Sequence, residues 1–271
     1  MGNEEHEKNE SRERQSMIQV QGITYGFQGE GDVFADFSWE VEKGASWSVL
    51  GPSGCGKTTL LYLLAGLVHP PRGQVVIAGQ PLSRPRPQTG LIIQEYGLLP
   101  WATVRENARL GLKIRGFYGP DGTHAPREAL TAGDVDPWLE RLGLEEQADK
   151  YPAQLSGGQR QRTAISRTLV LRPDLLLMDE PFSSLDAPTR ESLQELTLEL
   201  RAERDLTLVV VTHNIEEAAF MGEKILLLSN PPNRHPQVLA NPGAGSAAYR
   251  GSKDYLRICT TLRERMEGEN I

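Results

Sequence analysis

The chain has 271 residues, of which 38% are hydrophobic and 24% charged, as is ordinary for a globular protein. A net charge of −7 disfavours nucleic acid as the main ligand, because such proteins usually carry a basic excess. No apolar run approaches the roughly 18 residues of a membrane span, and the first 16 residues lack a signal-peptide core. We therefore expect a protein that reaches a membrane only through a partner.

The N-terminal part of the sequence alternates short apolar segments with turns. Residues 1–16 are mostly charged and polar, which predicts a disordered lead-in. A helix is expected at Thr58–Leu67. Strands are expected at Met17–Val20, Phe34–Val41, Ser46–Leu50, Gln74–Ala78 and Gly90–Ile93.

The middle of the chain, residues 95–170, is predicted to be a helical subdomain inserted in the core. Its helices are expected at Val104–Ile114, Pro137–Leu142 and Gln159–Leu171. A long connection containing glycine and proline, Arg115–Asp136, separates the first two.

Strands alternate with helices again after Asp174, which favours an α/β fold with a mainly parallel sheet. The segment Asn230–Ser246 is rich in proline and glycine and is predicted to be a surface loop. The expected elements are strands Leu175–Met178, Thr207–Thr212 and Lys224–Ser229, and helices Pro188–Glu203, Ile215–Met221 and Lys253–Met266.

A glycine-rich loop between a strand and a helix predicts a nucleoside triphosphate site. Its sequence is Gly51-Pro52-Ser53-Gly54-Cys55-Gly56-Lys57-Thr58, followed by Thr59. Glycines let backbone N–H groups surround a phosphate, and the helix N-terminus adds a positive dipole end. Lys57 is expected between the β- and γ-phosphates, and the Thr58 hydroxyl on Mg²⁺. A disulfide at Cys55 would obstruct this loop, which favours a reducing compartment for Cys55 and Cys259.

Two acidic residues, Asp179 and Glu180, end the apolar run Leu175–Met178. Carboxylates are costly to bury without partners, so packing alone does not account for them. The bland alternative is an acidic cap after a core strand.

The stretch Leu155-Ser156-Gly157-Gly158-Gln159, about a hundred residues after the glycine-rich loop, carries the most information. The loop, this stretch and the acidic pair, in this order, resemble the nucleotide-binding subunits of ABC transporters. The resemblance covers residues 17–230. It implies a P-loop NTPase core with a mainly parallel sheet, an N-terminal antiparallel β subdomain and the inserted α-helical subdomain, leaving 231–271 as a C-terminal loop and helix.

The resemblance also implies roles for single residues. It places Asp179 in the Mg²⁺ shell and makes Glu180 the group that polarises the attacking water. Gln94, at a strand end, is expected to contact Mg²⁺ and that water. His213, after the strand Thr207–Thr212, is expected to contact the γ-phosphate and orient Glu180.

The resemblance makes the assembly a pair. Ser156, Gly157, Gly158 and Gln159 start a helix that is expected to cap the ATP of a second copy of the subunit. Ser184-Leu185-Asp186 is expected at the seam, with Asp186 linking the two sites, although a simple helix start before Pro188 is also compatible.

The adenine requires an aromatic face near the N-terminal strands. Spacing to the loop favours Phe27, with Tyr25 as the second choice, and a core or surface aromatic is the plain alternative. The apolar connection Tyr96–Trp101 has two interpretations that stay open. It is either a docking groove for a helix of a membrane partner or part of the helical subdomain's own core.

Within ABC subunits, Gly97–Trp101 and Leu185–Arg190 resemble the importer group for nitrate, sulfonate, taurine and related solutes, which includes pyrimidine-precursor importers. We therefore expect a Mg²⁺-dependent ATPase, peripheral on the cytoplasmic side of the cell membrane, beneath two permease subunits served by a solute-binding protein. The alternatives are an importer ATPase for another solute, such as a pyrimidine or thiamine precursor, a non-transport ABC ATPase, and a scaffold that binds ATP without turnover. Intact Lys57, Glu180 and His213 count against the scaffold.

Overall fold

The computed structural model describes residues 15–27, 29, 31–118 and 135–268. The predicted lead-in lies outside the described residues except for Gln15 and Ser16, and Ser16 already belongs to the first strand. The centre of the connection Arg115–Asp136 also lies outside them. Within these ranges no helix is long and apolar enough to cross a membrane.

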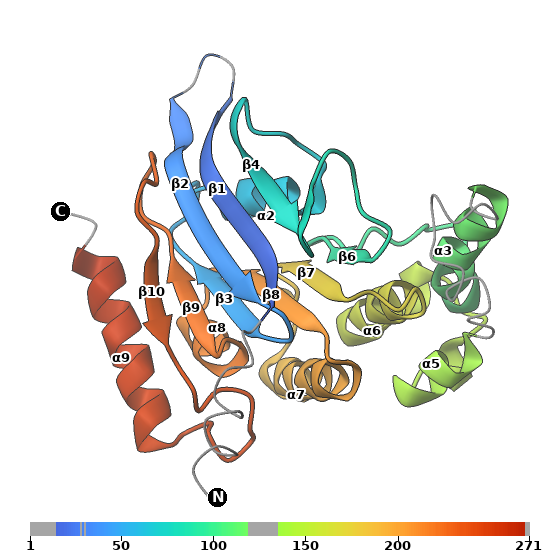
Figure 1. The fold of residues 1–271 in the computed structure, drawn as a ribbon. Coiled ribbons are helices and arrows are strands. Elements are labelled where there is room, and N and C mark those ends of the chain that lie inside the picture. The colour runs from blue at the N-terminus through green and yellow to red at the C-terminus, as the bar shows by residue number, and fades with distance from the viewer. Residues whose placement is uncertain (1–14, 28, 30, 119–134, 269–271) are drawn as a thin grey trace, which may run out of the picture.

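The described strands form two sheets (Figure 1). The smaller sheet is antiparallel, with strand order β2-β1-β4-β5. Strands β1 and β2 are both longer than predicted from the alternation of apolar residues. A shift in their register between Val20 and Ile23, a β-bulge or irregularity, lets the two strands continue to pair beyond Gly22. The strand bounds are Ser16–Gly26 for β1, Asp32–Glu42 for β2, Arg72–Ile77 for β4 and Gln80–Pro81 for β5.

The larger sheet has strand order β10-β9-β3-β8-β7-β6. Neighbouring strands run parallel from β9 through β3, β8 and β7 to β6, and β10 pairs antiparallel with β9. The α/β fold class, with an antiparallel β subdomain and a mainly parallel core sheet, is thus confirmed. The bounds are Ser46–Leu50 for β3, Thr89–Ile92 for β6, Leu175–Asp179 for β7, Thr207–Thr212 for β8, Lys224–Leu227 for β9 and Gln237–Ala240 for β10.

Strand β10 corrects the prediction of a surface loop over 230–246. Three of its four side chains are exposed, so the strand has no alternating apolar pattern. It exists because its backbone completes the hydrogen bonding of β9, a long-range pairing that local sequence does not encode.

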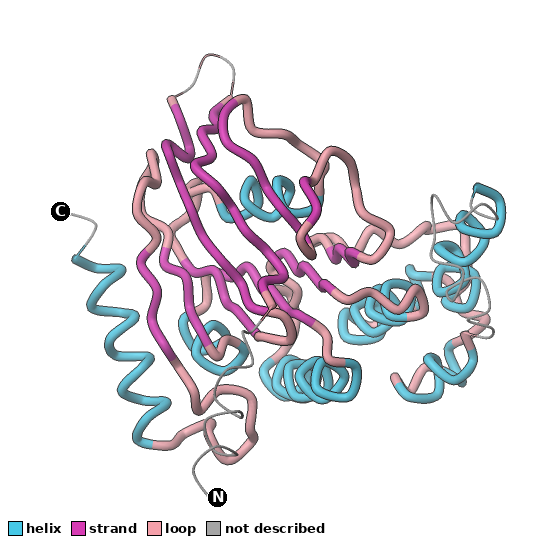
Figure 2. Tube along the Cα trace, viewed as in Figure 1, coloured by secondary structure: helices cyan, strands magenta, loops and turns pink. Residues whose placement is uncertain are grey.

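Helices cover both faces of the larger sheet (Figures 1 and 2). Helix α2 lies between the two sheets, whereas α7 and α8 pack on the opposite face and α9 packs on α8. Helices α3, α5 and α6 gather beyond the β6 edge as the inserted helical part. The bounds are Lys57–Ala65 for α2, Val104–Tyr118 for α3, Asp136–Arg141 for α5, Gly157–Leu169 for α6, Ala187–Arg204 for α7, Ile215–Met221 for α8 and Lys253–Gly268 for α9.

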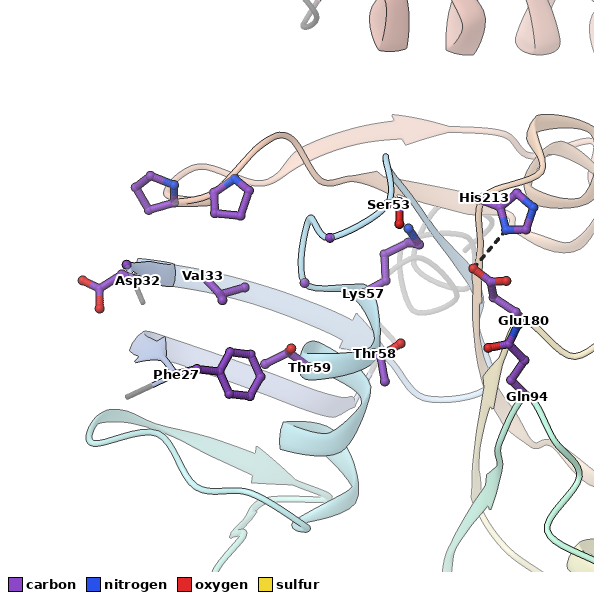
Figure 3. Close-up of a pocket in the computed structure, with 15 residues that line it drawn as sticks. Phe27, Asp32, Val33, Ser53, Lys57, Thr58, Thr59, Gln94, Glu180 and His213 are labelled. Atoms are coloured by element: carbon purple, nitrogen blue, oxygen red, sulfur yellow. Dashed lines mark ion pairs between the residues drawn. The ribbon is translucent and has the colours of Figure 1, made fainter. Parts of the chain in front are cut away.

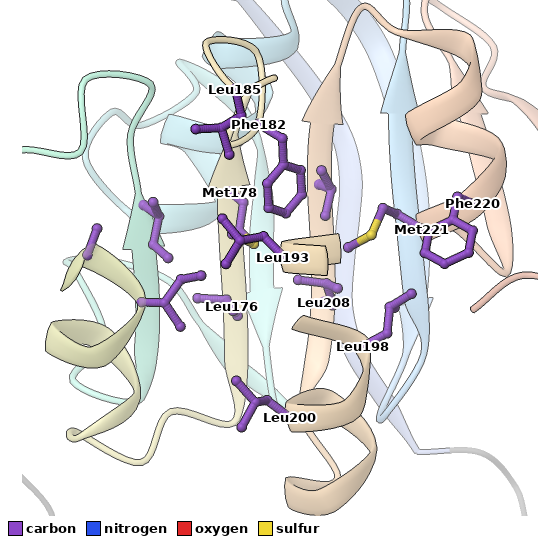
Figure 4. Packing of buried hydrophobic residues seen from close by; sticks show 14 of the residues in the cluster. Leu176, Met178, Phe182, Leu185, Leu193, Leu198, Leu200, Leu208, Phe220 and Met221 are labelled. Carbon is purple, nitrogen blue, oxygen red and sulfur yellow. The ribbon is translucent and has the colours of Figure 1, made fainter. Parts of the chain in front are cut away.

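The apolar run of β7 is buried on both faces, as expected of an inner parallel strand. Leu175 and Leu177 face the core shared with α2 and the small sheet. Leu176 and Met178 face the core shared with α7 and α8, where Phe182 lies just beyond the strand end (Figure 4). Alternate side chains of β7 therefore pack into the two cores, and this packing holds the carboxyl end of the strand in place.

Candidate active site

The glycine-rich loop joins β3 to α2 at the carboxyl edge of the larger sheet. Gly56 has φ +104°, and a Cβ there would lie 2.4 Å from Val33 Cγ1. Only glycine therefore lets the loop turn into the helix while packing on β2. Lys57 is 7% exposed, and its Nζ donates to the carbonyls of Gly51 and Pro52, both at 2.8 Å. The ammonium is thereby held inside the curve of the loop.

Thr58 and Asp179 connect the loop to β7. The Thr58 hydroxyl donates to Asp179 Oδ2 at 2.9 Å. Burial raises the pKa of the Asp179 carboxyl above its usual range, although the Thr58 hydrogen bond opposes this. Burial disfavours the charged form of this carboxyl, and a cation beside it would stabilise that form. Hydroxyl, carboxylate and amide oxygens are ligands that Mg²⁺ accepts, and the residues present fit this ion.

Glu180 and His213 lie together at the ends of β7 and β8. His213 Nδ1 is 2.9 Å from Glu180 Oε1. Glu180 has φ +43°, an uncommon conformation for a residue with a side chain, and its N–H donates to the Val211 carbonyl at 2.9 Å. Backbone strain of this kind is often found at functional sites, where the surrounding structure holds it in place.

Lys57, Thr58, Glu180 and His213 line one open pocket of about 940 Å³ (Figure 3). Lys57 and Thr58 lie between Phe27 at one end and Gln94, Glu180 and His213 at the other. The pocket is lined by Phe27, Gly31, Asp32, Val33, Ser53, Gly54, Gly56, Lys57, Thr58, Thr59, Gln94, Glu180, His213, Pro231 and Pro232. The volume and the run of groups suit a phosphorylated ligand with an aromatic base.

The structure separates the two candidates for the aromatic face. Phe27 lines the pocket and is 49% exposed. Tyr25 is not among the lining residues. It packs against the core of the small sheet and makes an edge-to-face contact with Phe27. Phe27 is therefore the ring placed to meet a base.

The predicted stretch Ser156–Gln159 does not line this pocket. Ser156 caps α6: its Oγ accepts from the Gln159 N–H at 3.2 Å, and Gln159 Oε1 accepts from the Ser156 N–H at 3.0 Å. A Cβ at Gly158 would lie 2.6 Å from Thr189 Cγ2. The glycine thus also serves packing within the chain, between α6 and the start of α7.

Asp186 also lies outside the pocket lining. It caps α7, with Oδ2 accepting from the Thr189 N–H at 3.3 Å. Hydrogen bonds from the side chain and then the backbone of Thr189 lower the pKa of the Asp186 carboxyl. Gly51, Pro52 and Cys55 belong to the loop without lining the pocket. The structure therefore brings the loop, Gln94, Asp179, Glu180, His213 and Phe27 together, and leaves Ser156–Gln159 and Asp186 outside the pocket lining.

The two ends of the connection Tyr96–Trp101 differ: one fits the prediction of a core segment, and the other fits the prediction of a docking surface. Tyr96 is buried, and its hydroxyl lies 2.5 Å from Ser184 Oγ. Arg167 on α6 donates to the carbonyls of Tyr96 and Gly97. Trp101, in contrast, is 74% exposed. One end of the segment is part of the protein's own core, and the other end is an exposed apolar surface.

Sequence reasoning missed Asn233, which fixes the rim of the pocket. Its Nδ2 donates to the carbonyls of Cys55 at 2.9 Å and Val33 at 3.2 Å, and its Oδ1 accepts from the Ser229 N–H at 2.9 Å. The same turn brings Pro231 and Pro232 to the pocket. The proline and glycine residues of this segment predict a loop, but no local pattern indicates that Asn233 binds the backbone of Cys55 and Val33.

A model of the family described as ABC transporter matches residues 34–183 of this chain. The chain belongs to the ABC transporter family. This ABC protein is 40% identical over 222 residues to the taurine import ATP-binding protein TauB of Pseudomonas aeruginosa, covering 81% of each chain. It is 38% identical over 239 residues to the aliphatic sulfonates import ATP-binding protein SsuB of Bacillus thuringiensis, covering 88% of this chain and 90% of that protein.

Solved structures show the same fold. The dimeric post-hydrolysis state of the ATP-binding cassette MJ0796, bound to ADP and Pi, superimposes with a TM-score of 0.68 at 29% identity. The alignment covers 83% of this chain and 98% of that one. The ABC protein described here is therefore an ATPase, and the expected resemblance to the taurine and sulfonate group is confirmed.

Proposed function

We propose that this ABC protein is the ATP-hydrolysing subunit of an importer for a taurine-like or sulfonate-like solute. It works as a pair with a second copy, beneath two permease subunits on the cytoplasmic side of the membrane, and a solute-binding protein delivers the cargo. The observation that carries the proposal is the pocket in which Lys57, Glu180 and His213 meet, in a chain 40% identical to a taurine import ATP-binding protein.

Each group of the pocket has a task in phosphoryl transfer. Phosphoryl transfer requires positioning and charge neutralisation rather than covalent catalysis. Backbone N–H groups of the loop and the Lys57 ammonium hold the β- and γ-phosphates, and Phe27 stacks on the adenine. Glu180 polarises the attacking water, while His213, 2.9 Å away, orients Glu180 and contacts the γ-phosphate.

Thr58, Asp179 and Gln94 are the residues that would hold Mg²⁺. When bound, the ion supplies positive charge to the phosphate oxygens. The Thr58–Asp179 hydrogen bond at 2.9 Å keeps the hydroxyl and the carboxylate on one side of the loop before any ion arrives.

The proposed dimer is inferred from residues that do not line the pocket. Ser156 and Gly157 stand at an exposed helix N-terminus that does not face the chain's own loop pocket. A helix N-terminus favours an anion. In a pair, this terminus would close on the γ-phosphate held by the other copy, with Asp186 at the seam. That the cassette MJ0796 is dimeric with ADP and Pi supports this arrangement.

The exposed end of Tyr96–Trp101 is the surface we assign to the permease. Trp101 is 74% exposed, while the Tyr96 hydroxyl at the other end is hydrogen-bonded to Ser184, next to the proposed dimer seam at Asp186. Movement at the seam therefore has a direct route to the apolar surface.

The decisive experiment measures ATP hydrolysis and assembly together. Glu180→Gln should lower the ATP turnover of the purified protein at least about 100-fold, because the carboxylate acts on the attacking water. The same variant should bind ATP and run as a dimer with ATP in size-exclusion chromatography with light scattering. Hydrolysis at the wild-type rate would refute the assignment of Glu180.

The solute is tested separately. The chain and its permease subunits, reconstituted in liposomes, should take up labelled taurine or ethanesulfonate when ATP is supplied inside with the binding protein outside. Uptake of a pyrimidine or thiamine precursor instead would leave the ATPase assignment standing and replace the solute.

A further inference from the structure

The turn Pro231–Pro232 reaches the nucleotide pocket from the C-terminal part of the chain. Both prolines line the pocket, and both are exposed. They lie beyond residues 34–183, the part of the chain that the ABC transporter model matches. Neither proline can donate or accept through its side chain, so the phosphate chemistry of the pocket does not explain their presence there.

The backbone of Asn233 attaches this turn to one edge of β2. The Asn233 N–H donates to the Val33 carbonyl, and the Ala35 N–H donates to the Asn233 carbonyl, both at 2.9 Å. Phe34 thereby pairs in parallel with Asn233, and it also pairs with Tyr25 of β1. Because a strand residue meets one neighbour at each edge, β2 lies between β1 and the Asn233 segment.

The direction of this pairing places the prolines at the start of β2. Asn233 lies beside Phe34, and the two segments run parallel. Pro232 and Pro231 therefore lie level with the first two residues of the strand, Val33 and Asp32.

Phe27 comes to the same level from the opposite edge. Strand β1 pairs antiparallel with β2, with Gly26 opposite Asp32, and Phe27 follows Gly26 directly. Neighbouring strands lie about 4.8 Å apart, so the flanking segments are about 10 Å apart across β2. Stacked rings have centroids about 4.5–7 Å apart, so a flat base that is contacted on both faces spans a distance of this size.

Val33 lies between these two flanks and against the phosphate loop. Its side chain is 8% exposed and lines the pocket, and a Cβ on Gly56 of the loop would lie 2.4 Å from Val33 Cγ1. Figure 3 shows Phe27 and Val33 at the end of the pocket away from Glu180 and His213. The phosphate loop therefore continues into an apolar end of the pocket.

We propose that Pro231 and Pro232 form a second wall of the base site, so that the adenine of ATP is held between the proline rings and Phe27. Asn233 keeps this wall in register with the phosphate loop, because its Nδ2 donates to the Cys55 carbonyl at 2.9 Å. Recognition through both faces of the base favours the larger ring system of a purine over that of a pyrimidine. This inference rests on the proposed function, in which the pocket binds ATP.

The test compares the binding of ADP and of pyrophosphate to the full chain by isothermal titration calorimetry. Pyrophosphate occupies the phosphate loop without a base. Pro231→Ala/Pro232→Ala should weaken ADP binding about fivefold, which corresponds to about 40 Å² of lost apolar contact, and leave pyrophosphate binding within about twofold. The preference for ADP over CDP should fall in the same variant. Each single variant is measured as well, so the test does not depend on the double variant folding.

Pro236→Ala is the matched control, because Pro236 belongs to the same segment but lies outside the lining of this pocket. It should leave the binding of all three ligands as in the wild type. Equal weakening of ADP and pyrophosphate would mean that the turn acts through the phosphate loop, and unchanged ADP binding would mean that the prolines do not touch the base. Either result, or an unchanged preference for ADP over CDP, would overturn the second wall. Absence of ADP binding to the wild type would instead refute the proposed function, so the two failures are told apart.

Discussion

His213 Nδ1 lies 2.9 Å from Glu180 Oε1, which joins the carboxyl ends of the neighbouring parallel strands β8 and β7. The two residues are 33 positions apart in sequence, with α7 between them. Parallel strands place their carboxyl ends at one edge of a sheet, where ligands of α/β folds bind. The contact therefore follows from strand order, and it gives the imidazole a fixed orientation toward the pocket.

Removing the imidazole should lower ATP turnover. We expect His213→Ala to reduce kcat at least about 100-fold, because Glu180 loses the group that orients it, while the affinity for ATP changes much less. Steady-state hydrolysis and fluorescence titration with ATP measure the two effects. His69→Ala, at an exposed histidine outside the pocket lining, is the control and should turn over ATP normally. A similar loss in both variants would argue against the role of His213.

Phe27 should contribute to binding and not to chemistry. Stacking of a base on an aromatic ring is worth about 1–3 kcal/mol, and we expect Phe27→Ala to weaken ATP binding by this amount while kcat at saturating ATP stays near wild type. Tyr25→Leu is the comparison, since Tyr25 lies next to Phe27 but outside the pocket lining. If Tyr25→Leu weakened binding and Phe27→Ala did not, the two rings would exchange roles.

The sequence was sufficient to predict a mainly parallel sheet and to place the glycine-rich loop and the acidic pair after strands of that sheet. Gly51–Thr58, Asp179 and Glu180 are contiguous motifs that follow apolar strands, and local patterns of this kind identify both element and chemistry. Strand β10 and the anchor Asn233 could not be predicted, because each depends on partners ten or more residues away. The positive φ of Glu180 was equally invisible, since glutamate carries no signal for that conformation.

Asn233 should hold the loop in place. Asn233→Ala leaves the carbonyl of Cys55 and the N–H of Ser229 short of a buried partner, whereas the Val33 carbonyl keeps the backbone N–H of residue 233. We expect this loss to cost about 2–4 kcal/mol in the free energy of unfolding. Urea denaturation measures this loss. Asn230→Ala, at an exposed asparagine of the same turn, should change stability little. Equal stability of the two variants would contradict the anchoring role.

Glu217 should make stability depend on pH in a specific direction. Its folded-state pKa is raised from 4.5 to about 7, chiefly by burial, with the nearby Glu180 charge adding and the Thr212 hydrogen bond and Arg190 charge opposing. Between these values the folded state binds more protons than the unfolded state, so this group's contribution to stability falls as pH rises and is level above about pH 7.

Glu217→Gln removes that dependence. The variant should gain stability relative to the wild type between pH 5 and pH 8, by an amount on the order of 3 kcal/mol. Denaturation curves at both pH values measure the difference, and Glu216→Gln should show none. A difference between Glu217→Gln and wild type that stayed constant with pH would contradict the raised pKa.

The central claim is that each ATP is hydrolysed between two copies of the chain, and mixing two inactive variants tests it most directly. Lys57→Ala damages the phosphate loop, and Ser156→Arg blocks the helix N-terminus that we assign to the partner's nucleotide. Each variant alone should be inactive. Half of the dimers in an equal mixture are heterodimers with one intact site of two, so about a quarter of the wild-type activity should return. If the mixture stayed as inactive as its components, sites shared between copies would be contradicted.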